Sequence, residues 1–298
     1  MTAKFRQIWD RPSSHPVIGP YWRLMRLDKP VGSLLILWPT LASLWIAGEG
    51  NPDISLIIIF TLGTFVMRSA GCVINDFADR KVDAGVARTA SRPLATGELS
   101  SRNAMVCFAV LGILAFGLVL LTDKRTILLS LVGLALAMIY PFLKRLTNLP
   151  QIWLGFAMNW GLVMAYSAQA DTLSPGLWIL YAATICWTVT YDTFYAMVDR
   201  EDDLRMGIKS IAILFGDLDR HMTAFLQMLT LAALFIASQR FGLGAPFLNF
   251  AVAGSALLFG YQQYLIRHRE PAACFAAFMN NRWVALLLFV GVITDFIF

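Results

Sequence analysis

The chain has 298 residues, of which 58% are hydrophobic and only 14% are charged, and its mean hydropathy is +0.63. A soluble domain carries about 25% charged residues, so this composition excludes an ordinary soluble protein and indicates a membrane protein. The formal net charge of +5 comes from basic residues in the loops of such a protein, and it gives no reason to expect a nucleic-acid partner.

Residues 1–20 have neither the apolar core and cleavage site of a signal peptide nor the Arg-rich amphipathic helix of a transit peptide. Apolar runs follow, each close to the length of about 20 residues that crosses a hydrocarbon core of about 30 Å. There are nine of them, near residues 31–48, 54–74, 103–122, 126–143, 151–170, 174–191, 222–240, 246–266 and 283–298. The sequence therefore predicts an all-α, polytopic membrane bundle of about nine transmembrane helices, with residues 1–298 forming a single transmembrane domain.

The basic residues predict the orientation, because Lys and Arg concentrate in cytoplasmic loops. Of the 24 basic residues, 20 lie in the N-terminal segment and in the loops after the second, fourth, sixth and eighth runs. Only Lys124, Arg125 and Arg240 lie on the opposite side, and Arg68 lies inside the second run. We therefore expect a cytoplasmic N-terminus and, without a transit peptide, a bacterial inner membrane.

Charged stretches directly follow the second and sixth apolar runs. The first is NDFADRKVD, Asn75–Asp83, and the second is DREDD, Asp199–Asp203. If each helix continues into its charged stretch, side chains spaced by whole turns project from one face. That face carries Asn75, Asp79 and Asp83 in the first stretch, and Asp192, Asp199 and either Asp202 or Asp203 in the second. The two Asp-x-x-x-Asp pairs are 120 residues apart, which predicts two four-helix halves with a ninth helix added.

Carboxylates that converge at a membrane surface repel one another, and they remain ionised together only when cations neutralise them. Hard divalent cations prefer carboxylate and amide oxygens, and Mg²⁺ in particular takes further oxygens from water and from a substrate phosphate. Basic residues near both stretches are expected to bind such a diphosphate directly: Arg88, Arg92, Lys144, Arg145 and Lys209. The residues alone therefore predict metal and diphosphate chemistry on the cytoplasmic side.

Each of these features also has a simpler interpretation. Charged residues at a helix end are ordinarily solvated loop residues, but two matched stretches on one side of the membrane favour a site. Arg68 could extend its side chain to the interface, but it lies about two turns inside Asn75 and is expected to face the bundle interior. The four cysteines and three histidines are too scattered to predict a disulfide framework or a metal cluster.

Longer motifs carry a resemblance to a known family. NDFADRKVD followed by RTASRPLATGELS, and YDTFYAMVDREDDLRMGIKS in the second half, resemble the two aspartate-rich motifs of the UbiA superfamily of intramembrane prenyltransferases. RLDKPVGSLLILWPT, MRSAGCVIND, YPFLKR and ACFAAFMNNRW also match. The resemblance covers nearly the whole chain. Within the superfamily it is strongest to the branch that transfers a polyprenyl group to 4-hydroxybenzoate in ubiquinone biosynthesis.

The resemblance implies roles for individual residues. It implies that the catalytic residues Asp79, Asp83, Asp199 and Asp203 hold Mg²⁺ against the diphosphate of a polyprenyl donor, with Asn75, Asp76, Asp192 and Asp202 as further metal ligands. It also implies that the basic residues beside the motifs bind the diphosphate, with Tyr140 donating a hydrogen bond. The acceptor carboxylate is expected at Arg26, Arg68 or Arg145. The acceptor ring would attack the allylic cation through the carbon ortho to its hydroxyl, in a cavity that excludes water. No obligate protein partner is expected, and membrane lipid surrounds the chain.

Other interpretations stay open. Homogentisate, dihydroxynaphthoate, haem or chlorophyllide could be the acceptor in the same family, because the physics of the motifs does not select the ring. A divalent-cation or organic-anion transporter also carries intramembrane acids and internal repeats, although here the acids lie at the membrane end and none lies in the middle of a run. A purely structural membrane protein would give no reason for two matched acidic stretches.

Overall fold

The computed structural model describes residues 12–81, 83–85 and 89–298, and these residues form helices and no strands. The long helices are α3 (Val31–Ala47), α4 (Ile54–Asp79), α5 (Ser101–Val119), α6 (Lys124–Leu146), α7 (Pro150–Ala170), α8 (Pro175–Val198), α11 (Asp219–Phe241) and α14 (Pro271–Ile297). The predicted run 246–266 is divided among α12 (Ala245–Phe247), the π-helical segment Leu248–Gly254 and α13 (Ser255–Leu265). Between them lie the short helices α2 (Ile18–Leu24), α9 (Arg200–Met206) and α10 (Ile211–Phe215). The prediction of an all-α chain is confirmed.

Local sequence explains where several of these helices begin. The Asp53 carboxylate accepts a hydrogen bond from the Ser55 backbone N–H at 2.8 Å, at the start of α4. The Ser174 hydroxyl accepts one from the Leu177 N–H at 3.3 Å, with Pro175 in the first helical position of α8. Asp and Ser are favoured N-cap residues because their oxygens satisfy backbone donors that have no partner inside the helix.

Four stretches are long and apolar enough to cross a membrane: Ile54–Asp79, Ser101–Val119, Ile211–Phe241 and Pro271–Ile297. Large apolar side chains point outward from the bundle, as at Ile113 on α5 and Leu257 on α13, which are 72% and 79% exposed. Such exposure is costly in water and favourable in lipid. The chain is therefore an integral membrane protein, while the count of nine spans and the cytoplasmic N-terminus remain predictions.

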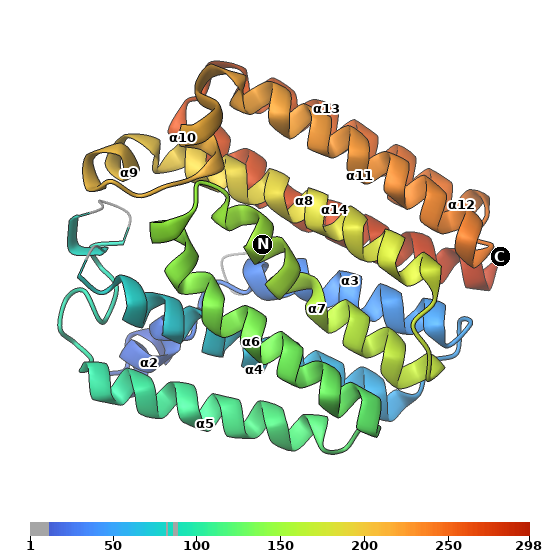
Figure 1. Cartoon of the computed structure of the whole chain (residues 1–298), viewed down its shortest axis with the longest axis horizontal. Coiled ribbons are helices and arrows are strands. Elements are labelled where there is room, and N and C mark those ends of the chain that lie inside the picture. The colour runs from blue at the N-terminus through green and yellow to red at the C-terminus, as the bar shows by residue number, and fades with distance from the viewer. Residues whose placement is uncertain (1–11, 82, 86–88) are drawn as a thin grey trace.

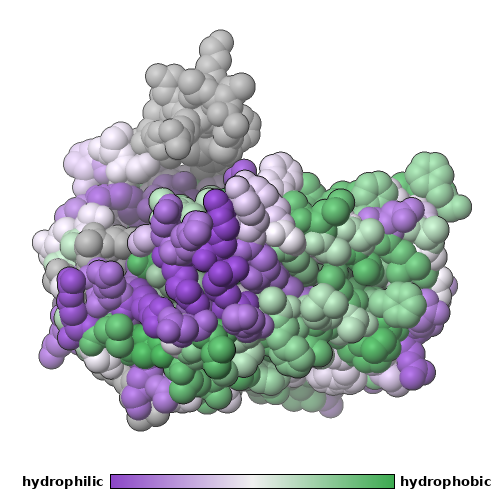
Figure 2. Space-filling model, turned by 90° about the horizontal axis from the view of Figure 1, so that it is seen from above, coloured by the Kyte–Doolittle hydropathy of each residue, from purple (hydrophilic) through white to green (hydrophobic). Residues whose placement is uncertain are grey.

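The helices pack in a closed arrangement. Each of the long helices from α3 to α8 packs on the next one along the chain, α8 packs on α11, and α14 packs on both α3 and α8. The loops after α4, α6 and α8 gather at one end of the bundle, whereas the loops after α3, α5 and α7 lie at the other end with the C-terminus (Figure 1). We call the first of these the acidic end, because α4 ends there and α9 lies there. Hydrophilic residues concentrate at the acidic end, and hydrophobic residues cover much of the remaining surface in this view (Figure 2).

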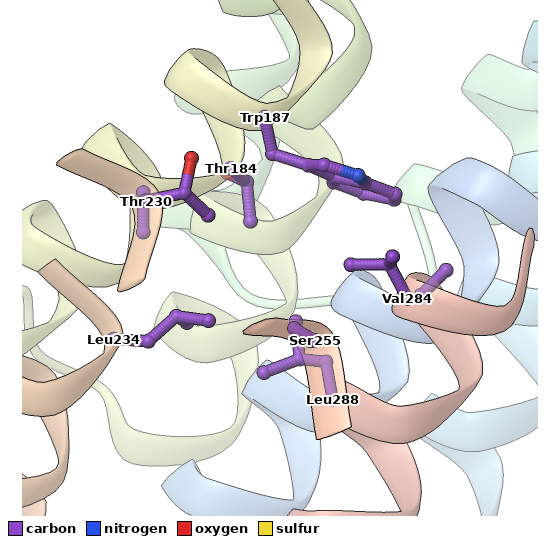
Figure 3. Close-up of a pocket in the computed structure, with 9 residues that line it drawn as sticks. Thr184, Trp187, Thr230, Leu234, Ser255, Val284 and Leu288 are labelled. Carbon is purple, nitrogen blue, oxygen red and sulfur yellow. The ribbon is translucent and has the colours of Figure 1, made fainter. Parts of the chain in front are cut away.

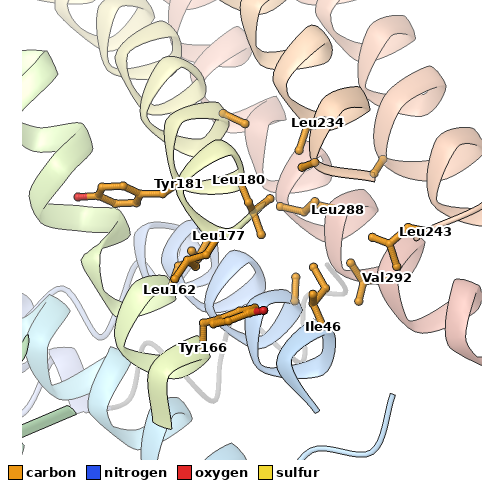
Figure 4. Close-up of a cluster of buried hydrophobic side chains, with 14 of the residues drawn as sticks. Ile46, Leu162, Tyr166, Leu177, Leu180, Tyr181, Leu234, Leu243, Leu288 and Val292 are labelled. Atoms are coloured by element: carbon orange, nitrogen blue, oxygen red, sulfur yellow. The ribbon is translucent and has the colours of Figure 1, made fainter. Parts of the chain in front are cut away.

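The largest hydrophobic cluster joins the helices away from the acidic end. Leu162 of α7, Leu180 of α8, Leu234 of α11 and Leu288 of α14 are all at most 4% exposed and point toward one another (Figure 4). Close packing of this kind is a main source of stability for helices in lipid, where the hydrophobic effect no longer drives their association. The cluster therefore fixes the bundle at one end and leaves the charged side chains to organise the other.

Polar bonds add to this packing between α7 and α8. The Asn159 side-chain amide donates to the Gly155 carbonyl at 2.9 Å on its own helix, and to the Thr188 hydroxyl at 2.8 Å and the Thr184 carbonyl at 3.3 Å on α8. Asn159 is only 3% exposed. Replacing it removes all three bonds at a helix interface.

We expect Asn159→Leu to lower the free energy of unfolding by about 1 kcal/mol, the usual size of an interhelical hydrogen bond in a membrane protein. Unfolding of the purified protein in detergent would measure this. Thr188→Val removes only one of the bonds and should cost less. An Asn159→Leu protein as stable as the wild type would contradict the role assigned to this amide.

Candidate active site

The first acidic stretch leaves the helix earlier than predicted. α4 ends at Asp79, so Asn75 and Asp79 lie one turn apart on one face, but Asp83 lies beyond the helix in a 3-10 turn, Asp83–Gly85. The prediction that Asp83 continues the helical face is therefore wrong. The Arg80 guanidinium donates to the Phe77 carbonyl and lies 4.2 Å from the centre of the Phe77 ring. The Phe77 carbonyl therefore accepts a hydrogen bond from this side chain, at the position where a continued helix would supply a backbone N–H donor.

The second acidic stretch also breaks. α8 ends at Val198, and Asp199 has φ −94° and ψ 3°, outside the helical range, before α9 begins at Arg200. The Asp199 carbonyl accepts from the Asp203 N–H at 2.8 Å, so Asp199 starts the new short helix. Asp192 on α8 and Asp203 on α9 consequently do not share one continuous helical face, and this prediction is wrong too.

The two acidic stretches nevertheless lie close together. A Cβ atom at Gly85, just after Asp83, would be 3.1 Å from the Met206 methyl group, so the 3-10 turn touches α9. The Tyr140 side chain of α6 interacts electrostatically with both Asp192 and Asp79. Residues that are more than 100 positions apart in the sequence therefore meet at the acidic end, where the loop after α4 and α9 lie on the same side of the bundle (Figure 1).

Two arginines hold the first acidic stretch. Arg26 Nη2 lies 2.9 Å from Asp76 Oδ1 and 2.8 Å from Asp76 Oδ2. Arg92 Nη1 lies between two carboxylates, 3.0 Å from Asp76 Oδ1 and 2.9 Å from Asp83 Oδ2. Burial raises the pKa of the Asp83 carboxyl, and the Arg92 guanidinium opposes that shift. Arg26 and Arg92, predicted to bind the acceptor and the diphosphate, are thus paired with carboxylates in the protein alone.

The donor set at the end of α4 fits a hard divalent cation. The Asn75 Oδ1 atom is buried and has no hydrogen-bond partner among the described residues, and Asp79 on the next turn is 9% exposed. Within the same part of the chain, no group of three or more His, Cys, Asp and Glu side chains is assembled closely enough to hold a metal by itself. Mg²⁺ commonly takes one or two protein oxygens and completes its shell with water and substrate phosphate, so these residues fit it together with a diphosphate.

A half-buried guanidinium, that of Arg68, lies deeper in the bundle. Arg68 Nη1 donates to Cys72 Sγ at 2.7 Å, and its Nε is buried without a hydrogen-bond partner. No carboxylate of the described residues lies within ion-pair distance of it. The backbone of Gly32 in α3 passes so close that a Cβ there would be 2.7 Å from Arg68 Nη2. Arg68 thus lies against α3, as the prediction that it faces the interior requires.

Aromatic side chains of α8 line the space near Arg68. Tyr191 and Tyr195 both interact with Arg68 electrostatically. The ring centres of Trp187 and Tyr191 are 5.1 Å apart, and those of Tyr195 and Phe278 of α14 are 4.8 Å apart. Because Trp187, Tyr191 and Tyr195 recur every four residues, they form one aromatic face that runs from the acidic end into the bundle.

The structure describes three of the predicted basic residues only in part or not at all. Arg88 lies outside the described residues, and Lys144 and Arg145 belong to α6 with side chains outside the description. Lys209 is half-buried and lies three residues after the end of α9 in the sequence. The roles predicted for these residues remain predictions.

Sequence reasoning missed an ion-pair cluster behind the second acidic stretch. Asp219, the first residue of α11, is fully buried. Its carboxylate lies 2.9 Å from Arg269 Nη2 and 3.9 Å from Arg200 Nη1, and Arg200 directly follows Asp199. The cluster ties α9 to the start of α11 and to the turn before α14. The segment GDLDR gives no local signal of this cluster, because Arg269, the partner of Asp219, is 50 residues away.

Two cavities lie away from the acidic end. One of about 10 Å³, no larger than a single water needs, lies among Thr184, Trp187, Thr230 and Leu288 (Figure 3). The other, of about 710 Å³, is lined by residues at the opposite end of the bundle, including Glu49 and Arg240. Neither contains the acidic stretches.

We expect Asp219→Asn to destabilise the protein by about 1–3 kcal/mol, because Arg269 and Arg200 lose a charged partner in a buried position. Hydrogen exchange of the α9 amides should increase more than exchange in α5, since α9 is the element that the cluster holds. Asp217→Asn is the matched control, because Asp217 is exposed, accepts the Arg269 hydrogen bond through its backbone carbonyl, and acts on Arg269 with its carboxylate only electrostatically. Unchanged exchange in α9 would show that the cluster does not hold this helix.

Solved structures share this fold. The chain is similar to the apo structure of a UbiA homologue from Aeropyrum pernix K1, with a TM-score of 0.77 and 25% identity over 89% of this chain and 97% of that one. It is also similar in fold to a UbiA homologue from Archaeoglobus fulgidus bound to GPP and Mg²⁺, with a TM-score of 0.69 and 20% identity over 92% of this chain and 99% of that one.

Curated relatives are closer in sequence. A 4-hydroxybenzoate octaprenyltransferase from Saccharophagus degradans is 57% identical over 92% of both chains. The protein of the same name from Tolumonas auensis is 54% identical over 92% of this chain and 95% of the relative. The model of the UbiA prenyltransferase family matches residues 36–290, which include both acidic stretches, Arg68 and the aromatic face. The chain therefore belongs to the UbiA prenyltransferase family.

Proposed function

We propose that this protein transfers a polyprenyl group from polyprenyl diphosphate to the ring carbon ortho to the hydroxyl of 4-hydroxybenzoate, with release of diphosphate, in ubiquinone biosynthesis. The observation that carries the proposal is the meeting of two acidic stretches and two arginines at one end of an apolar bundle. The names of relatives with more than 50% identity over most of both chains support the choice of reaction.

The acidic end binds the head of the donor in this proposal. Asn75 and Asp79 on α4, with Asp83 beyond it, and Asp199 and Asp203 around the start of α9 would hold Mg²⁺ against the diphosphate. Asp192 and Asp202 would support the second set. Bound Mg²⁺ would supply positive charge that stabilises the leaving diphosphate. Arg92 and Lys209, with Arg88, Lys144 and Tyr140, would bind the phosphate oxygens, because charge-assisted hydrogen bonds are the strong ones.

Arg68 is the residue we propose for the acceptor carboxylate. Its Nε is buried, no carboxylate of the described residues lies within ion-pair distance of it, and it lies beside the aromatic face of α8. A ring held there would present its ortho carbon toward the donor, and the electron-rich faces of Tyr191 and Tyr195 would stabilise an allylic cation in a site without water. Arg26 is engaged by Asp76, which favours Arg68 for this role. The side chain of Arg145 lies outside the described residues.

The long isoprenoid tail explains the membrane setting. A donor that is half diphosphate and half hydrocarbon places its head where the helices end and its tail among helices or in lipid. We propose that the nine helical segments span a bacterial inner membrane in two four-helix halves plus α14, with the acidic end in the cytoplasm. The excess of basic residues on that side supports this orientation.

We expect Asp79→Asn and Asp199→Asn each to reduce prenyl transfer by about 100-fold or more, since each removes negative charge that holds the metal and the diphosphate. Membranes carrying the protein, polyprenyl diphosphate and labelled 4-hydroxybenzoate would form a lipid-soluble product with Mg²⁺ and none after chelation. Asp171→Asn, 86% exposed at the opposite end, is the control and should retain full activity. Full activity in both motif variants would refute the proposed site, and metal flux in proteoliposomes without donor would favour a transporter.

We expect Gly32→Ala to raise the KM for 4-hydroxybenzoate by about tenfold while the KM for the donor stays unchanged. The added methyl group would displace the Arg68 guanidinium and weaken one charge-assisted bond to the acceptor. Gly63→Ala in α4 is the matched control, because a Cβ at Gly63 meets no atom within 4 Å. Equal effects on both KM values would remove Arg68 from the acceptor site.

A further inference from the structure

Both side-chain oxygens of Asp76, in the first acidic stretch, are paired with arginines. Its side chain is 1% exposed, and both of its oxygens lie within 3.0 Å of guanidinium nitrogens. Oδ2 pairs with Arg26, and Oδ1 pairs with both Arg26 and Arg92. The neighbouring Asn75 instead has a buried oxygen without a hydrogen-bond partner among the described residues.

The helix explains this difference. Adjacent residues on an α-helix point about 100° apart, so Asp76 faces away from Asn75. Its side chain points toward the segment after α2, where Arg26 has a left-handed backbone with φ +57° and also donates to the Arg23 carbonyl at 2.8 Å. A left-handed conformation is unfavourable for arginine, so contacts must hold it there. The bonds to Asp76 and to Arg23 are such contacts.

Recruiting Asp76 to a metal would be costly. Both ion pairs would have to break, which would leave Arg26, only 19% exposed, without its carboxylate, and Arg92, only 15% exposed, with Asp83 as its one carboxylate among the described residues. Removing one member of a partly buried ion pair leaves an uncompensated charge, which is strongly unfavourable. Asp83 is in a different position, because Arg92 would keep its bond to Asp76 when Asp83 turns toward a metal.

Arg92 therefore pairs with two carboxylates: Asp76, which would stay in place, and Asp83, which could turn toward a metal. The Nη1 atom of Arg92 makes the contacts with both Asp76 and Asp83, and a guanidinium has five N–H donors. Release of Asp83 would leave Arg92 fixed in place by Asp76, with its other donors available to phosphate oxygens. Arg26, fixed by the same carboxylate, would form the other side of this basic pair.

We propose that Asp76 is a positioning residue and not a metal ligand: it holds Arg26 and Arg92 at the acidic end so that they bind the donor's diphosphate. The proposal deepens the proposed function and rests on it for the identity of the donor. It differs from the expectation, drawn from the resemblance, that Asp76 is a further metal ligand. It also separates two tasks within one motif, metal binding by Asn75 and Asp79 and arginine placement by Asp76.

The test measures metal binding and diphosphate binding separately. Mn²⁺, a paramagnetic substitute for Mg²⁺, is titrated into the purified protein and followed by electron paramagnetic resonance, and inorganic diphosphate is then titrated in the presence of the metal. Asp76→Asn should leave Mn²⁺ affinity within about twofold and weaken diphosphate binding about tenfold, the loss of one charge-assisted bond. Asp79→Asn is the matched comparison, and it should weaken Mn²⁺ binding itself.

A double-mutant cycle shows whether Asp76 acts through Arg92. In the Arg92→Gln background, Asp76→Asn should have a clearly smaller effect on diphosphate binding than in the wild type, because one of its two partners is already gone. If Asp76→Asn does not fold, Asp76→Glu keeps the charge and moves it, and it should again weaken diphosphate binding with Mn²⁺ affinity unchanged. Loss of Mn²⁺ affinity equal to that of Asp79→Asn, or fully additive effects in the cycle, would overturn the proposal.

The outcome is independent of the overall reaction. If the wild type transferred no polyprenyl group to 4-hydroxybenzoate, the proposed function would fail. The binding measurements with Mn²⁺ and inorganic diphosphate would still decide the role of Asp76.

Discussion

Carboxylates buried at the end of an apolar bundle need positive partners, and the structure around them is organised by this need. Isolated charges are expensive to bury, so each acidic group must be paired or must hold a cation. Asp76 and Asp219 meet the requirement within the protein, through Arg26 and Arg92 in one case and Arg269 in the other. Asn75, in contrast, has a buried side-chain oxygen without a hydrogen-bond partner among the described residues, and we assign this oxygen to the metal.

The same requirement explains why the two ends of the bundle differ. Away from the acidic end, leucines of four helices fill a dry core that needs no polar partner. At the acidic end, helices stop early, turns such as Asp83–Gly85 begin, and arginines connect segments that are remote in the chain. A reaction that forms an allylic cation benefits from both properties, because the head of the donor requires charge and the cation requires the absence of water.

The arrangement also bears on the transporter alternative. A transport pathway would need polar groups along the bundle, whereas the large cavity of the described residues lies at the opposite end from the acidic stretches and does not contain them. The interior between the ends holds mainly apolar and aromatic side chains, and buried polar groups such as Asn159 and Thr188 are hydrogen-bonded to each other between helices. Membership of the UbiA prenyltransferase family agrees with this view.

The sequence by itself determined the helical segments, the membrane setting, the family and the presence of two acidic stretches. These features depend on local quantities, namely the length of apolar runs, cap residues such as Asp53 and Ser174, and the composition of short motifs. The tertiary structure decided where α4 and α8 end, how Arg80 and Asp199 redirect the chain, and which carboxylates are paired. The Arg26–Asp76 and Arg269–Asp219 pairs each join residues 50 positions apart. Helical periodicity relates residues only over a few turns of one helix. It therefore could not show that Asp76 pairs with arginines from other segments, whereas the side-chain oxygen of the adjacent Asn75 has no hydrogen-bond partner among the described residues.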